Sequence, residues 1–178
     1  MLESFSFFGV QKEMTLMAKE EKQRKNKRAL YVELGKQAVK ALAKFLESKN
    51  GELVVSIHES QYSAGSFGQP DLVFKEYGIE VKRIQFVCKH KPYGRQKKPH
   101  INLGSFKLEH RSWTDLKAWC AQHGKTPLLV VALHYQRRKP IFVKLTQSQV
   151  DELQKSQLYK KYIQLDCWRC LQQGEVWT

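Results

Sequence analysis

Apolar and polar residues recur at helical spacing across residues 30–45. Six apolar residues fall on one side of such a helix: Leu30, Leu34, Ala38, Ala41, Leu42 and Phe45. The opposite side collects Glu33, Lys36, Lys40 and Lys44. This pattern predicts an amphipathic helix with one buried face. The Asn50–Gly51 pair is a typical helix end.

Short apolar runs bounded by turn residues predict five strands. They cover residues 53–57, 71–74, 79–87, 128–133 and 141–145. The second and third runs are close enough to form a hairpin around a glycine turn. The run at 128–133 is almost wholly apolar, as expected of a central strand that is covered on both faces.

Capping residues predict two further helices. Ser112 and Asp115 fit a capping-box start, and Gly124 closes that helix. Thr146 caps a short helix that runs through Leu153. The resulting order is helix, three strands, helix, two strands and helix. This order predicts an α/β fold in which helices flank a single mixed β-sheet.

The same pattern divides the chain into three parts. Residues 1–28 open with a weak apolar segment, followed by a highly charged stretch at 19–28 with no sustained core stripe, so we interpret them as a basic arm. Residues 29–155 hold the predicted core. Residues 156–178 are too aromatic for a solvated extension, so we expect them to pack on the core or on a partner subunit. Their aromatic residues include Tyr159, Tyr162, Trp168 and Trp177.

Positive charge is spread along most of the chain. The 178 residues include 31 Lys and Arg against 17 Asp and Glu, which gives a formal net charge of +14. Distributed charge of this size favours a polyanionic partner, and nucleic acid is the first candidate. The basic arm would then be mobile or bind DNA. The alternative is a basic protein without such a partner, in which repulsion between the positive charges of different molecules maintains solubility.

Cysteine usage and hydropathy indicate a cytoplasmic protein. No apolar run approaches the roughly 20 residues that cross a bilayer, and no signal peptide is evident. The cysteines, which we expect to be reduced, are Cys88, Cys120, Cys167 and Cys170. The two-residue gap between the last pair occurs in metal sites, but buried thiols are the favoured interpretation.

Two acids and a lysine on the predicted hairpin carry the candidate chemistry. In a strand, Glu80 and Lys82 share one face, and Asp71 lies at hairpin distance from them. Mg²⁺ prefers hard oxygen ligands, so Asp71, Glu80 and the backbone carbonyl of Val81 could hold it. Lys82 would then orient a nucleophile or offset developing negative charge. The alternative is an exposed hairpin with an ordinary Glu/Lys pair.

Three segments resemble the PD-(D/E)XK nuclease superfamily, which has the restriction-endonuclease-like fold. They are the loop at residues 62–66, the strand at residues 79–82, and the helix end at Gly124 that leads into residues 126–131. Within that superfamily the chain looks most like the archaeal Holliday-junction resolvases. The resemblance covers roughly residues 30–153.

The resemblance implies specific roles for these residues. Such resolvases are Mg²⁺-dependent homodimers that cut four-way DNA junctions, with Mn²⁺ able to substitute. Asp71 and Glu80 become metal ligands, and Lys82 becomes the catalytic lysine. Ser63 or Ser66 becomes the loop serine near the scissile phosphate.

The chain departs from that family at the first helix. A family glutamate usually reaches the metal from this helix, but an ungapped match puts Val39 at its position. Glu33 lies six residues earlier. It is therefore either a further site residue or half of a solvated pair with Lys36.

The segment at 89–100 predicts a basic loop beside the site. Its DNA-contacting candidates are Lys89, Lys91, Arg95, Lys97 and Lys98, to which the first helix adds Lys36 and Lys40. A sequence-specific restriction or homing type endonuclease remains an alternative to a junction resolvase. A non-catalytic DNA-binding module on the same fold is a further alternative.

Overall fold

The structure is a computed structural model. It describes residues 7–50, 56–57, 68–89, 100–102, 105–135 and 138–177. The chain forms two compact units, Met1–Leu34 and Gly35–Thr178. Within the described residues, no helix is long and apolar enough to cross a membrane.

The first helix, α1, spans Phe7–Asn50 and begins well before residue 30. Residues 20–27 are exposed along it. Glu20 pairs with Arg24 at 3.8 Å and Glu21 with Lys25 at 2.8 Å, both at i,i+4 spacing. Such pairs and good helix-forming residues support a helix without a buried stripe. A search for apolar periodicity alone therefore misses this part.

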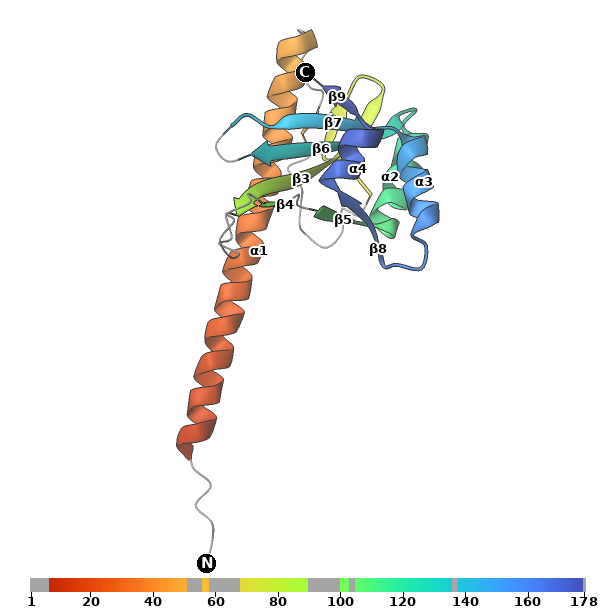
Figure 1. Cartoon of the computed structure of the whole chain (residues 1–178). Coiled ribbons are helices and arrows are strands. Elements are labelled where there is room, and N and C mark those ends of the chain that lie inside the picture. The colour runs from red at the N-terminus through yellow and green to blue at the C-terminus, as the bar shows by residue number, and fades with distance from the viewer. Residues whose placement is uncertain are drawn as a thin grey trace, which may run out of the picture. The chain divides into compact units, whose positions relative to one another are not determined.

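A seven-stranded sheet organises the second unit (Figure 1). Its order is β1-β2-β3-β6-β7-β9, and β4 pairs with the far end of β3. The strands are β1 (Ser56–Ile57), β2 (Leu72–Phe74), β3 (Tyr77–Lys89), β4 (His100–Asn102), β6 (Thr126–Tyr135), β7 (Ile141–Leu145) and β9 (Glu175–Trp177). Only the β3–β6 pair is parallel among these described strands. The predicted mixed α/β architecture is confirmed.

A second, two-stranded sheet and three helices complete this unit, so the prediction of a single sheet is wrong. Strands β5 (Ser105–Glu109) and β8 (Tyr162–Asp166) pair antiparallel. The helices are α2 (His110–Gln122), α3 (Gln147–Ser156) and α4 (Cys167–Gln173). The backbone N–H of Thr146 donates to Gln149 Oε1 at 2.7 Å, so the predicted cap of α3 is confirmed. Helix α2 begins at His110, before the predicted start at Ser112.

Two hydrophobic clusters cover the two faces of the large sheet. Apolar residues of α2, α3, α4, β5 and β8 pack on one face, together with Ile84, Leu129 and Val131. On the other face the part of α1 in this unit packs through residues such as Leu42 and Leu46. Because β6 lies between both clusters, residues 127–133 are all buried. This confirms the predicted central strand.

The C-terminal segment belongs to the body of this unit. Strand β9 pairs with β7, and β8 buries Ile163 and Leu165. Tyr159 and Trp168 instead remain 81% and 58% exposed. The segment therefore packs through its strands rather than through all of its aromatic residues.

A polar network joins α2 to α3 beside the first cluster. Asp151 accepts hydrogen bonds from Trp113 Nε1 and Lys117 Nζ, each at 2.8 Å. Burial raises the pKa of Asp151, but the hydrogen bonds from Lys117 and Trp113 outweigh it and leave the pKa below its usual value. The partly buried carboxylate is thus satisfied while it holds two helices together.

Gly78 sets the close approach of α2 to the hairpin. The turn of the hairpin is formed by Lys75 and Glu76, so the expectation of a glycine turn is wrong. Gly78 lies inside β3, where an added Cβ would come within 2.5 Å of Cys120 Sγ. The absence of a side chain at this position allows α2 to lie directly over the strand.

We predict that Gly78→Ala lowers the free energy of unfolding by about 2 kcal/mol through overpacking. Removing the thiol with Cys120→Ala in the same chain should recover part of that loss. A double-mutant cycle of denaturant unfolding measures the coupling. Strictly additive losses would contradict the proposed contact.

Candidate active site

The β2–β3 hairpin places Asp71 opposite Glu80. Leu72 pairs with Ile79 in the antiparallel register, and the preceding residue of one strand faces the following residue of the other. Leu72 and Ile79 are buried on the α1 side of the sheet. Because side chains alternate along a strand, Asp71 and Glu80 share the opposite side, which α2 covers.

Lys82 lies beside this pair of acids. Its Nζ forms an ion pair with Glu80 Oε1. The side chains of Lys82 and Glu80 are 29% and 15% exposed, so both are accessible from one edge of a largely buried environment. The sequence prediction that these two residues point away from Ile79 and Val81 is confirmed.

The surroundings of Asp71 shift its pKa strongly. One of its oxygens, Oδ2, accepts a hydrogen bond from the backbone N–H of Val81 at 2.8 Å. Burial and the nearby negative charge of Glu80 raise its pKa to about 7, although Lys82 and the Val81 N–H act in the opposite direction. A carboxyl group whose pKa is raised by burial and by a neighbouring negative charge is a frequent feature of functional sites.

The donor atoms suit a hard divalent cation. The N–H and C=O of a strand residue point to the same side, so the Val81 carbonyl is expected on the β2 side of the strand, where its N–H reaches Asp71. Two carboxylates and a carbonyl suffice for Mg²⁺, which keeps several of its waters. No group of three or more His, Cys, Asp and Glu side chains that could hold a metal occurs in the described part of the chain.

Four further positions discussed for the site belong to α1. Glu33 is exposed on α1 and belongs to the first unit. Val39, at the position of the family glutamate, is a buried core residue. Lys36 and Lys40 belong to the helix whose core residues cover the opposite face of the sheet from Glu80. Val39, Lys36 and Lys40 therefore add no carboxylate beside Asp71, and the role of Glu33 stays a prediction.

Six of the predicted site residues fall in the undescribed segments between β1 and β2 and between β3 and β4. Ser63, Ser66, Lys91, Arg95, Lys97 and Lys98 lie outside the described residues. Lys89 is the last residue of β3, on the strand that carries Glu80. The roles proposed for these side chains stay predictions.

Two structural contributions to the site were missed from the sequence. The Val81 N–H fixes one oxygen of Asp71, and Gly78 lets Cys120 of α2 approach the strand. Cys120 and Cys170 are buried, which confirms the prediction of a buried thiol for Cys170. Burial raises the pKa of the Cys120 thiol to about 11, which leaves it unreactive near neutral pH.

Comparison of the chain with protein-family models, with curated proteins and with solved structures finds no match.

The raised pKa of Asp71 predicts a specific pH dependence. Between about pH 4 and pH 7 the folded protein holds this proton more tightly than the unfolded chain, so rising pH lowers the free energy of unfolding. Asp71→Asn should therefore stabilise the metal-free protein by about 2 kcal/mol near pH 8, and by less near pH 5. Thermal unfolding in EDTA measures both values.

Adding Mg²⁺ should reverse the order of stability near pH 8. A cation between the two carboxylates offsets their repulsion, so it should raise the Tm of the wild type more than that of Asp71→Asn. Glu152→Gln, on the exposed surface of α3, is the matched control for unspecific cation binding. Equal Mg²⁺ shifts in all three proteins would contradict a shared cation site.

Proposed function

We propose that this chain is a Mg²⁺-dependent DNA endonuclease that hydrolyses phosphodiester bonds, with a preference for branched DNA such as the four-way junction. The observation that carries this proposal is the placement of Asp71, Glu80 and Lys82 on one side of the β2–β3 hairpin. The acids would hold the cation, and Mn²⁺ would replace Mg²⁺.

Some residues of the site would stabilise charge during the reaction, and others would hold the reacting groups in position. A bound divalent cation would stabilise charge on the phosphoryl oxygens and acidify a water molecule. Asp71 is held in place by the Val81 N–H, which leaves its other carboxylate oxygen for the cation. The Lys82 ammonium, now paired with Glu80, would turn toward the scissile phosphate, orient the attacking water and offset charge in the transition state.

Basic residues support a DNA substrate. The net charge of +14 favours contact with a phosphate backbone. Strand β3 carries Glu80 and Lys82 and ends at Lys89, where the basic segment of residues 90–99 follows in the sequence. Because that segment directly follows the strand with Glu80 and Lys82, DNA that it binds would reach the candidate site.

A homodimer fits cleavage of two DNA strands. The described residues of one chain supply one such group of two acids and a lysine, so two related sites would come from two copies. A junction with two-fold symmetry would then be cut at equivalent positions. A sequence-specific nuclease of restriction or homing type would use the same chemistry on linear duplex.

A non-catalytic DNA-binding module is the second candidate. Val39 favours this candidate. It is a buried apolar residue at the position where nucleases of the PD-(D/E)XK superfamily, which the chain resembles, usually carry a metal-binding glutamate. With that glutamate missing, the fold would bind DNA but not cut it.

A cleavage assay separates these functions. We expect the wild type to cut four-way junctions in Mg²⁺ or Mn²⁺ but not in EDTA, and to cut linear duplex and flap substrates more slowly. Asp71→Asn, Glu80→Gln and Lys82→Met should each lower the rate at least about 100-fold. Glu152→Gln should cut as the wild type does.

DNA binding in Ca²⁺ or EDTA is the companion measurement. If the three site variants bind junction DNA but the wild type never cuts any substrate, the binding module is supported. Preferred cutting of linear duplex at defined sequences would replace the resolvase with the sequence-specific nuclease. Cleavage that survives all three substitutions would refute the site.

A further inference from the structure

A pocket of about 400 Å³ lies on the α1 side of the sheet. It is formed within the second unit by the end of α1, the β2–β3 turn and β9. Its volume falls in the range of roughly 300–1,000 Å³ that is usual for small-molecule sites.

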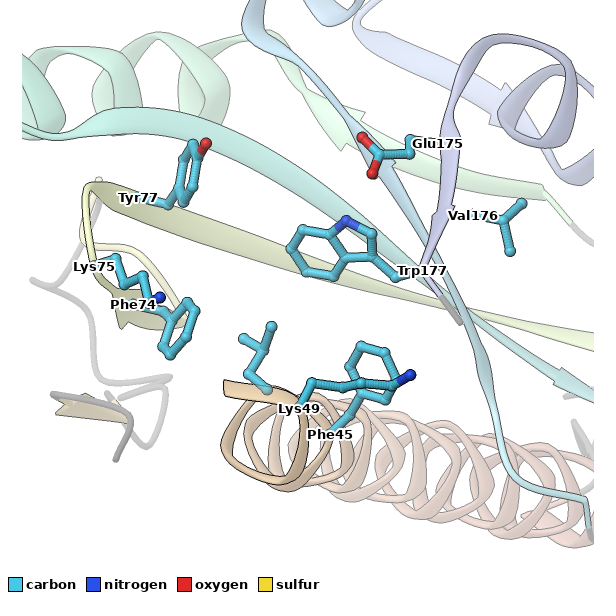
Figure 2. Close-up of a pocket in the computed structure, with 9 residues that line it drawn as sticks. Phe45, Lys49, Phe74, Lys75, Tyr77, Glu175, Val176 and Trp177 are labelled. Atoms are coloured by element: carbon cyan, nitrogen blue, oxygen red, sulfur yellow. The ribbon is translucent and has the colours of Figure 1, made fainter. Parts of the chain in front are cut away.

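Aromatic rings form the body of the pocket. Figure 2 shows the Trp177 indole at its centre, with Phe45 of α1 on one side and Phe74 and Tyr77 of the hairpin on another. Trp177, Phe45 and Tyr77 are each only partly buried. Lys144 Nζ lies over the Trp177 ring, 5.6 Å from its centroid, so a base would stack on the other face of this indole. Flat aromatic surfaces of this kind stack on planar heterocycles.

Lysines lie beside these rings, and Lys75 Nζ is positioned over the Phe74 ring at 5.5 Å from its centroid. Lys49 and Lys75 line the pocket and are both exposed, and Lys40 and Lys44 are exposed earlier on α1. The one acid that lines the pocket, Glu175, is paired with Lys144. Among the residues that line the pocket, two lysines therefore outnumber one acid.

We propose that this pocket binds a nucleotide. Its base would stack on Trp177, and its phosphate would contact Lys49 and Lys75. Glu175 would accept a hydrogen bond from an exocyclic amino group of the base. A planar ring joined to a phosphate matches both features of the pocket, whereas an apolar peptide or lipid chain would use the rings alone.

The nucleotide pocket is separate from the candidate active site. Phe74 pairs with Tyr77 in the hairpin, and both line the pocket on the α1 side. Glu80 faces the opposite side of the sheet, as the alternation along β3 requires. Nucleotide binding is therefore expected whether or not the chain cleaves DNA.

Two sources could supply this nucleotide. It could be a free nucleoside phosphate, or an unstacked nucleotide within a single-stranded segment of DNA. Calorimetric titrations with dAMP and with the tetranucleotide (dA)₄, both in EDTA, distinguish them. Deoxyadenosine and hexyl phosphate are the probes that lack the phosphate and the base, respectively.

Variants at the pocket test both halves of the proposal. We expect Trp177→Ala to weaken dAMP or (dA)₄ binding about tenfold or more, and Trp177→Phe to retain most of it. Lys49→Ala should weaken binding about threefold, whereas the matched Lys155→Ala, in the last turn of α3, should not. Lys75→Asn suits the positive φ of 51° at that turn and should resemble Lys49→Ala.

Each outcome decides between clear alternatives. Binding of dAMP that depends on Trp177 supports a free nucleotide, and such binding by (dA)₄ alone supports a DNA segment. Hexyl phosphate binding as tightly as dAMP, or no Trp177-dependent binding by either nucleotide, overturns the proposal. Asp71→Asn should leave binding unchanged, so a failed nuclease assay and a failed pocket are distinguishable.

Discussion

The antiparallel register of the β2–β3 hairpin is the constraint on which the candidate site depends. Because Leu72 pairs with Ile79, Asp71 and Glu80 meet on one side of the sheet while apolar neighbours fill the other. A shift of one residue would move the acids apart and expose the core residues. Burial in the α1 cluster therefore fixes the position of the polar group on the opposite face. The same packing that stabilises the fold brings two negative charges together.

That concentration of charge has a cost for folding that a bound cation would remove. The pKa of Asp71, raised to about 7, records both its burial and the charge of Glu80. Lys82 offsets part of this charge, and the Val81 N–H holds one Asp71 oxygen. Natural chains retain such unfavourable groups mainly where they serve a function. The positive charge elsewhere on the chain is compatible with a phosphate-rich substrate that crosses this face.

Local sequence patterns predicted those parts of the structure that depend on local physics. The apolar run of β6, the exact limits of β7 and the cap at Thr146 follow from burial and capping chemistry. The grouping of Asp71 with Glu80 and Lys82 follows from strand alternation and one short turn. The sequence patterns did not predict that α1 begins at Phe7. Around residues 20–25 the helix is accompanied by surface ion pairs rather than by an apolar stripe.

Non-local pairing accounts for most of what the sequence did not predict. Residues 105–109 and 162–166 each alternate between buried and exposed positions, but their pairing joins distant segments. The pocket around Trp177 likewise combines three separate elements. The sequence shows the aromatic residues of the pocket, but it does not predict that they lie next to Lys49 in the fold.

A crystal structure of the protein with Mn²⁺ tests the shared cation most directly. An anomalous peak within about 2.2 Å of oxygens from both Asp71 and Glu80 is the predicted result. A peak bound to neither carboxylate, or carboxylates that point away from each other in the presence of the metal, would contradict the account.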